Sequence, residues 1–445
     1  MKKTILALLL LAIGGITQAQ AIQEKLDDYC RAFEATGNFH GFVQVKQKGK
    51  TVLSSGYGYA NVDQKTKGND HTVYQVGSIT KQFTATVILK LAEQGKLGLQ
   101  DKLSKYYPSF PKSDQVTIEQ LLSHTSGIKS YTGVPQLFDS IKTVSVNEAF
   151  MVKTFATFPY DFEPGTNWSY SNSAYSLLGY IITKVTGKSY EQNVREMILQ
   201  PLGMSESGFD FKNLKAAKAT GYYRVSEEQS IPAKLVDSTV SYSAGSFYTT
   251  AADLSKWNNS LFTGKIISLK SMDNAHTVRK NNNGLGWFIE NIHGKRVIQH
   301  GGGIDGFLCQ NYVVPEEGIE LTVLGNVGSF DPNKFSTDLL GIMLGQQVEK
   351  PVKKTGVEVD VAVLKQYEGE YELEPGMTAS FMVREGKLLV DTHHDPVEEL
   401  LPKGDNVFAF THMEATLEFV KGSDGKVEKF VFRQGSNTRE AKKIK

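Results

Sequence analysis

Strand-like segments lie at both ends of residues 22–345, and helical segments lie between them. Apolar and polar residues alternate, as in β-strands, over residues 41–45, 51–59, 286–292, 296–300, 307–314 and 319–326. In the middle, apolar residues recur roughly every three to four positions, which predicts helices over residues 78–95, 117–126 and 173–187 and from 250 onward. A last helix is expected over 334–344. This order implies an antiparallel sheet flanked by helices, plus a helical subdomain, which is an α+β fold.

A second, smaller domain is expected at the C-terminus. Residues 346–360 contain a proline and a lysine cluster with little apolar periodicity, so we interpret them as a linker. Short strands follow over residues 367–373, 379–383, 387–391, 407–410, 416–420 and 427–432. Repeated short strands predict a small all-β, barrel-like domain over residues 361–445, with a sandwich as the alternative.

The N-terminus has the features of a secretory signal peptide over residues 1–21. Two lysines precede an apolar run from Ile5 to Ile13, and small residues surround Ala19 and Ala21. A membrane-spanning helix needs about 20 apolar residues, and this run is too short for one. We therefore expect a periplasmic or secreted protein with no stable membrane anchor.

The charge and cysteine content restrict the expected partners. With 49 Lys and Arg against 48 Asp and Glu, the chain carries a formal net charge of +1. No field of one sign attracts it to nucleic acid, so a small-molecule or peptide-like substrate is the expected partner, and the oligomeric state stays open. Cys30 and Cys309 fit either a disulfide or two separate thiols, and neither has a catalytic motif beside it.

The segment Ser78-Ile79-Thr80-Lys81 is a Ser-x-x-Lys motif at the start of a predicted helix. Its spacing places the hydroxyl and the ammonium on one helix face, one turn apart. The motif alone is weak, because the same spacing occurs at Ser109 and Lys112, Ser126 and Lys129, and Ser423 and Lys426. Ser78 differs because it follows Gly77 at a helix N-terminus, where free N–H groups favour developing negative charge. On spacing alone, a helix cap with a solvated lysine is the alternative.

Tyr170-Ser171-Asn172 precedes the helix predicted over residues 173–187. A tyrosine with a pKa of about 10 is a poor base, but a nearby lysine cation would lower that pKa by stabilising the phenolate. Asn172 offers a donor and an acceptor, for a substrate amide or for the lysine. A turn tyrosine bonded to backbone is the alternative for this segment alone.

The run His300-Gly301-Gly302-Gly303 follows a predicted strand. Glycines let a ligand approach the strand backbone closely, so that backbone N–H groups can polarise a carbonyl. A phosphate loop would need a following helix and a lysine, and the chain has no metal-ligand spacing such as H-E-x-x-H. We expect no metal and no cofactor, and an ordinary glycine-rich turn is the alternative.

In this order, Ser-x-x-Lys, Tyr-x-Asn and His-Gly-Gly resemble the serine β-lactamase-related family of class C β-lactamases, D,D-carboxypeptidases and related esterases. The resemblance extends from about residue 25 to 345 and includes the phrases LLSHTSG at 121–127 and GSFYTT at 245–250. The region that begins with YEGEY at 367–371 resembles the lipocalin-like β-domain attached to some members.

The resemblance implies an exported serine hydrolase that forms an acyl-enzyme with an ester or amide substrate. Ser78 would be the nucleophile, and Lys81 and Tyr170 would share the acid and base roles. The groups that would bind the substrate are Asn172, His300, Gly302 and Gly303. The backbone N–H groups of Ser78 and Gly303 would form the oxyanion hole. Tyr170 would also activate the deacylating water.

One departure from the family bears on the substrate. In β-lactamases of this fold the third motif is usually Lys-Thr-Gly, whose cation and hydroxyl help bind the substrate carboxylate, whereas here it is His300-Gly301-Gly302. His300 would donate a hydrogen bond or carry charge below about pH 6.5. We expect an esterase or peptidase for peptide-like substrates, including those with D-amino acids, with slow or no β-lactam turnover. The alternatives are a sensor that is acylated without turnover, and a β-domain that carries an apolar ligand beside an inactive scaffold.

Overall fold

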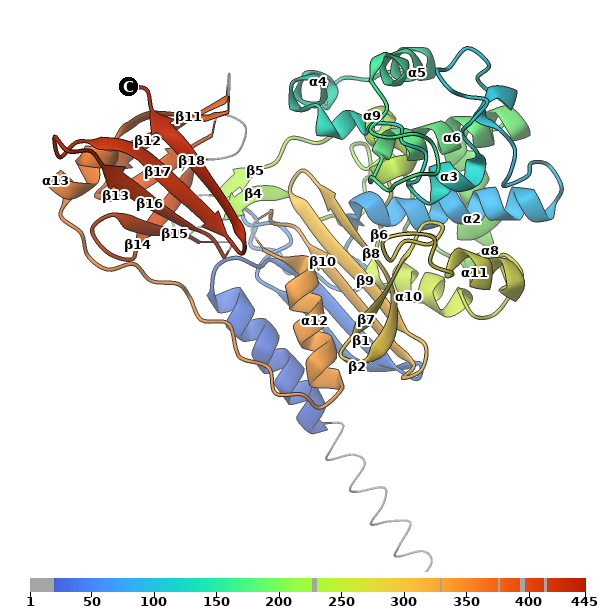
Figure 1. Ribbon diagram of the computed structural model, residues 1–445. Helices are drawn as coiled ribbons and strands as arrows, with labels where there is room; N and C mark the ends of the chain where they lie inside the picture. Colours follow the sequence, from blue (N-terminus) through green and yellow to red (C-terminus); the bar gives the residue numbers. More distant parts are fainter. Residues whose placement is uncertain (1–19, 226–229, 329, 375–376, 393–396, 412–413) are drawn as a thin grey trace, which may run out of the picture.

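The computed structural model describes residues 20–225, 230–328, 330–374, 377–392, 397–411 and 414–445 (Figure 1). The predicted signal peptide lies outside the described residues except for positions 20 and 21, which begin a helix over residues 20–35. This helix is not among those predicted above, although Leu26, Tyr29 and Cys30 recur at helical spacing and are buried.

Six antiparallel strands form the central sheet. Their order across the sheet is β2 (Lys50–Tyr57), β1 (Gly41–Gln47), β10 (Ile319–Gly325), β9 (Phe307–Val314), β8 (Lys295–Ile304) and β7 (Phe288–Ile292). β1 pairs directly with β10, with Gly41 opposite Gly325. Both ends of the main unit therefore share one sheet, as the sequence predicted.

Separate cores cover the two faces of this sheet. The helix over residues 20–35 and α12 (Pro332–Met343) pack on one face, where Val43, Val45 and Leu321 are buried with them. The helical region packs on the other face (Figure 1). Cys30 lies in the first core and Cys309 in the second, and both are free thiols. The structure therefore overturns the disulfide alternative, because the sheet lies between them.

The helical region is inserted between β2 and β7. Its α-helices are α2 (Thr80–Glu93), α3 (Ile118–Leu122), α4 (Pro135–Ile141), α5 (Glu148–Thr157), α6 (Asn172–Thr186), α7 (Tyr190–Val194), α8 (Gln200–Leu202), α9 (Ser238–Gly245), α10 (Ala251–Ser260) and α11 (Leu269–Ala275). Thr117 and Gln120 form the capping box of α3, and Ser171 and Thr250 cap α6 and α10. The predicted helix over 117–126 ends earlier, at Leu122, because His124 has a left-handed backbone with φ 59°.

The C-terminal domain is a closed eight-stranded barrel. Its strands are β11 (Gly369–Glu374), β12 (Met377–Arg384), β13 (Lys387–Asp391), β14 (Glu398–Pro402), β15 (Val407–Phe410), β16 (Thr416–Lys421), β17 (Val427–Gln434) and β18 (Asn437–Lys443). Stacked and edge-on rings fill its interior, with the Tyr367 and Phe419 centroids 4.3 Å apart. β14 and β18 were not predicted because their polar residues hide the apolar alternation.

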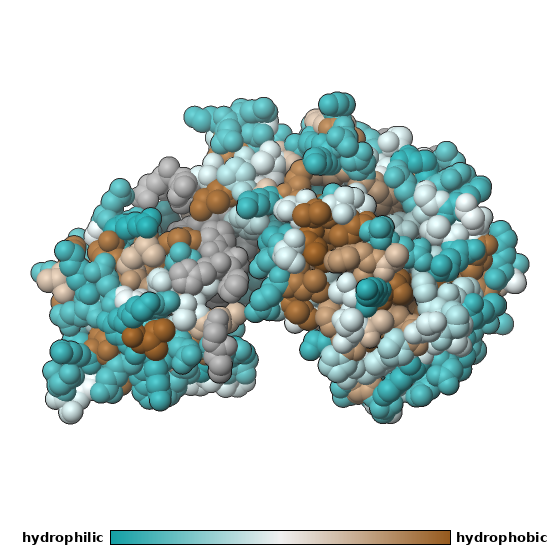
Figure 2. All heavy atoms as spheres, turned by 90° about the horizontal axis from the view of Figure 1, so that it is seen from above, coloured by the Kyte–Doolittle hydropathy of each residue, from teal (hydrophilic) through white to brown (hydrophobic). Residues whose placement is uncertain are grey.

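The barrel lies beside the main unit, and Figure 2 shows a recess between the two. The Asn38 amide donates to the carbonyl oxygen of Thr411 over 3.2 Å. A cavity of about 1720 Å³ is lined from both sides, by Tyr223 and His40 of the main unit and by Phe381 and Phe430 of the barrel. In the described part of the chain, its lining includes no residue of the three sequence motifs. No helix among the described residues has the length and apolar content that crossing a bilayer requires.

Candidate active site

Ser78 lies in a single 3-10 turn, η1 (Gly77–Ile79), which leads into α2. The Thr80 hydroxyl donates to the carbonyl oxygen of Gly77 over 2.6 Å and holds this turn. Gly77 has φ 48°, and a Cβ there would lie 2.7 Å from the carbonyl oxygen of Gly303. Ser78 is half-buried between two buried neighbours, so its side chain is the accessible part of the turn.

Lys81 is fully buried, and its ammonium nitrogen has three polar neighbours. Nζ lies 3.0 Å from Ser78 Oγ, 2.8 Å from Asn172 Oδ1 and 2.7 Å from the carbonyl oxygen of Ala244. Burial lowers the pKa of Lys81 well below its ordinary value. In the neutral amine, the two N–H groups donate to Asn172 Oδ1 and to the carbonyl oxygen of Ala244, because these two oxygens can only accept. The lone pair then faces Ser78, which is the geometry of a base for the serine hydroxyl.

A backbone kink in α9 turns the Ala244 carbonyl toward Lys81. Tyr242 has φ 36° and ψ −133°, a strained conformation for a residue with a side chain. The carbonyl oxygen of Ser243, the residue before Ala244, accepts from the Thr84 hydroxyl over 2.7 Å. Two successive carbonyls are thereby directed at α2. The sequence does not reveal this kink, because backbone strain has no signature in residue type or spacing.

Asn172 is oriented by residues that the sequence motifs did not include. Its Nδ2 donates to Thr132 Oγ1 over 2.9 Å, and its backbone N–H donates to Ser130 Oγ over 3.1 Å. The two hydroxyls of Ser130 and Thr132 are themselves 3.0 Å apart. Both ends of the Asn172 amide are therefore occupied, with the oxygen toward Lys81. No spacing in the sequence distinguishes Ser130 or Thr132 from other loop hydroxyls.

Tyr170 covers Lys81 with its ring and reaches Ser78 with its hydroxyl. The centroid of the ring is 4.8 Å from Lys81 Nζ. Burial raises the pKa of Tyr170, while a hydrogen bond with Ser78 acts in the opposite direction. The expectation that a lysine cation would lower this pKa is wrong for the free enzyme. Desolvation dominates here and disfavours the phenolate.

His124 supports Tyr170 from behind. The two ring centroids are 4.3 Å apart, and His124 Nδ1 accepts the backbone N–H of Ser171 over 3.1 Å. Burial holds the pKa of His124 well below its ordinary value, and Lys81 and His300 lower it further when they are protonated. His124 belongs to the LLSHTSG phrase at 121–127, whose spacing predicts no contact with Tyr170.

The glycine run lies within β8 rather than after a strand as predicted. A Cβ on Gly302 would lie 1.9 Å from the carbonyl oxygen of Val76 and 3.1 Å from the backbone nitrogen of Ser78, so only glycine allows this approach. Gly303 is exposed to solvent. The structure thus brings β8 directly against the turn that carries Ser78.

His300 is buried and neutral, contrary to the expectation that it carries charge below about pH 6.5. Burial, and then repulsion from Lys81 when that side chain is protonated, lower the pKa of His300 to about 3. Its Nδ1 lies 2.6 Å from the carbonyl oxygen of Gly301, and its ring lies beside Phe288 and Tyr170, with centroids 5.3 and 6.3 Å away.

Comparisons with known proteins agree with this fold. The sequence model of the family described as Beta-lactamase matches residues 26–340. Penicillin-binding protein 4* of Bacillus subtilis (strain 168) is 29% identical over 446 residues, covering 93% of this chain and 98% of that protein. The structure of an octameric penicillin-binding protein homologue from Pyrococcus abyssi has a TM-score of 0.65 at 25% identity, and covers 94% of this chain and 99% of that one.

A D-amino acid amidase from Ochrobactrum anthropi SV3, in complex with L-phenylalanine amide, has a TM-score of 0.62 at 26% identity and covers 73% of this chain and 98% of its own. The α+β fold and these similarities define a serine hydrolase that works through an acyl-enzyme. The chain belongs to the beta-lactamase family.

Proposed function

We propose that this chain is an exported serine hydrolase in which Ser78 is the nucleophile, Lys81 the base and Tyr170 the acid. One observation carries the proposal: Lys81 Nζ has two carbonyl acceptors, on Asn172 and Ala244, and its third neighbour is Ser78 Oγ. A buried neutral amine held in this way accepts the serine proton as Oγ attacks the substrate carbonyl.

The oxyanion that forms on the substrate needs donors beside Ser78. We assign this role to the backbone N–H groups of Ser78 and Gly303, with Gly302 allowing the close approach. The support is the contact of β8 with η1, in which Gly303 lies against Gly77. One such donor is typically worth about 10² to 10³ in rate.

Tyr170 would protonate the leaving group and later activate the deacylating water. Its raised pKa keeps the hydroxyl protonated in the free enzyme, which suits an acid. After Ser78 has transferred its proton to Lys81, the lysine cation lies against the Tyr170 ring and eases the loss of the phenolic proton. Asn172 fixes Lys81, and no step requires a metal or cofactor.

The proposed substrate is an ester or amide of peptide-like character. The D-amino acid amidase and the penicillin-binding proteins among the relatives support this class, and D-configured residues are included in it. A signal peptide over residues 1–21, a catalytic domain over 22–345, a linker over 346–360 and a β-domain over 361–445 complete the proposal. The N-terminal lysines and apolar run support export to the periplasm or beyond.

Hydrolysis of a short-chain p-nitrophenyl ester by the mature protein and by Ser78→Ala tests this proposal. We expect steady turnover that depends on Ser78. Release of one equivalent of p-nitrophenol per enzyme molecule, with no further turnover, would instead favour the sensor alternative. Equal rates for both proteins would contradict the proposal.

A further inference from the structure

His300 offers an unused hydrogen-bond acceptor beside the proposed catalytic tyrosine. A carbonyl oxygen can only accept, so the 2.6 Å contact with Gly301 requires the hydrogen on Nδ1. In a neutral ring, Nε2 then carries a lone pair. Only 3% of His300 is exposed, and Nε2 has no hydrogen-bond partner in the described part of the chain.

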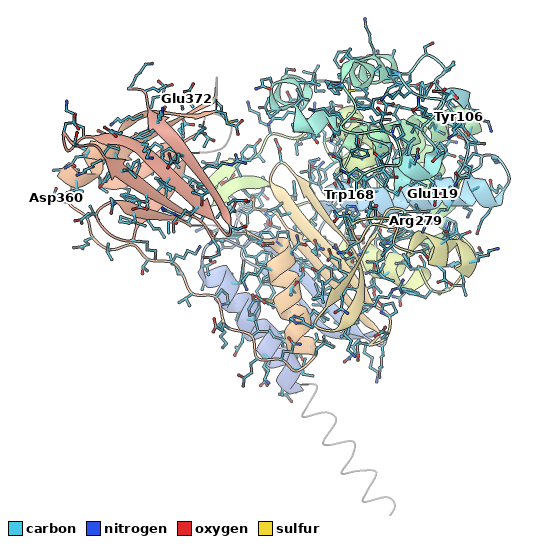
Figure 3. The ribbon with its side chains drawn as sticks, in the orientation of Figure 1. Tyr106, Glu119, Trp168, Arg279, Asp360 and Glu372 are labelled. Carbon is cyan, nitrogen blue, oxygen red and sulfur yellow. The ribbon has the colours of Figure 1, made fainter. Side chains whose placement is uncertain are left out.

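This acceptor lies among aromatic rings of the site. Phe288 meets the His300 ring edge-on, with centroids 5.3 Å apart, and the centroid of the Tyr170 ring lies 6.3 Å from that of His300. The ring of Trp168 lies 6.4 Å from that of Phe288, between the sheet and the helical region (Figure 3). Phe288 and Trp168 are half-buried, so this aromatic wall is open to solvent on one side.

A buried acceptor without a partner is rare and calls for an explanation, such as a ligand group that satisfies it. A carboxylate does not suit this neutral ring, because its oxygen would face the lone pair of Nε2. An N–H group would complete the bond. The low pKa of His300 keeps the ring in this accepting form throughout the neutral range.

We propose that His300 Nε2 accepts a hydrogen bond from an N–H group of the substrate. The enzyme therefore prefers substrates that have an amide or amine N–H beyond the scissile carbonyl. Substrates that end there in a carboxylate are disfavoured. Binding of that N–H group requires the half-buried Phe288 ring, which packs against His300, to give way. This inference rests on the proposed hydrolase function and adds the substrate class to it: peptides that continue, or end in a carboxamide, past the cleaved bond.

Two matched peptides test the preference, N-acetyl-D-alanyl-D-alanine and the same peptide with a C-terminal carboxamide. For the wild-type protein we expect kcat/KM to favour the carboxamide by roughly tenfold or more, as one satisfied hydrogen bond gives. His300→Lys should reverse the preference and His300→Leu should bring the ratio close to one. His300→Gln, which retains an acceptor, should keep the preference for the carboxamide. Thermal unfolding confirms that each variant is folded.

The ratio between two peptides is independent of how much each variant loses in overall rate. If neither peptide is cleaved, the same ratio is read from their inhibition constants against p-nitrophenyl ester turnover. The inference is overturned if the wild-type protein treats the two peptides equally or favours the carboxylate. The proposed function still stands in that case, provided that ester turnover depends on Ser78. Absence of any Ser78-dependent turnover overturns both.

Discussion

Asn172 donates its side-chain N–H to the Thr132 hydroxyl over 2.9 Å, and this contact fixes which end of the amide faces Lys81. The carbonyl end accepts from Lys81 Nζ over 2.8 Å. If the amide were flipped, its N–H groups would face Lys81. The lone pair of the amine would then accept from Asn172 and point away from Ser78. Thr132 therefore positions the proposed base without contacting the reacting atoms.

Thr132→Val should lower kcat/KM for a p-nitrophenyl ester by roughly tenfold, because one hydrogen bond that orients the amide is lost. The acid limb of the pH profile should move to lower pH, since a less firmly held acceptor stabilises the Lys81 cation less. Thr132→Ser keeps the hydroxyl and serves as the control. A purely structural role would lower activity without moving the limb, and that result would contradict the positioning role.

Lys81→Met should reduce the rate of acylation by about 10² to 10⁴, the usual contribution of a general base. In the wild-type protein, kcat/KM should fall as the pH drops through the lowered pKa of Lys81, because the protonated amine cannot accept the serine proton. Stopped-flow release of p-nitrophenol measures both effects. A variant as fast as the wild type would exclude Lys81 as the base.

The same pair of proteins reports on stability. The pKa of Lys81 lies below 10.5 in the folded state and near its ordinary value when unfolded, so between these values the unfolded chain binds more protons. The stability that Lys81 contributes is therefore fully present above the pKa of the unfolded state, and it is lost as the pH falls through the pKa of the folded state. Urea unfolding at about pH 8 and about pH 10 should show a wild-type free energy of unfolding that rises relative to Lys81→Met. Parallel pH dependences would contradict the burial of the amine.

Tyr170→Phe should keep the ring contacts with His124 and Lys81 but remove the hydroxyl. We expect turnover to fall by about 10² to 10⁴ with little change in thermal stability, because only the acid and base role is lost. Comparing the burst with the steady state separates acylation from deacylation. Normal turnover by the variant would remove Tyr170 from the mechanism.

Gly302→Ala and Gly303→Ala should differ sharply. A Cβ on Gly302 would lie 1.9 Å from a backbone oxygen of Val76, whereas one on Gly303 would meet only a Leu308 side chain, at 3.3 Å. The first change should separate β8 from the serine turn and abolish activity, while the second should retain most of it. Circular dichroism and ester turnover of both variants check this, and a Gly302→Ala variant that keeps wild-type activity would mean that the close approach is unimportant.

The fold was predictable where side-chain periodicity carries it. Alternation in β1, β9 and β10 and the four-residue spacing in α2 and α6 gave the sheet and the main helices. The polar strand β18 gave no such signal, because a strand with mostly exposed residues has no apolar face to alternate. The number of barrel strands was underestimated for that reason.

The candidate site was predictable where a motif places residues close in sequence or in a known order. Ser78, Lys81, Tyr170, Asn172 and the glycine run came from such motifs, and the structure brings them together. Thr132 and the Tyr242 kink depend on loop geometry and backbone strain, which no spacing records. The direction of the Tyr170 pKa also needed the structure, because burial opposes the effect of a nearby charge.

In the proposed mechanism, Ser78 is the nucleophile that forms the acyl-enzyme. Intact-mass spectrometry of the mature protein after exposure to a fluorophosphonate, a β-lactam or a p-nitrophenyl ester tests it most directly. We expect a fluorophosphonate adduct of one label per chain, which maps to Ser78 and is absent from Ser78→Ala. Labelling that persists in Ser78→Ala, or no adduct with any of the three probes, would contradict it.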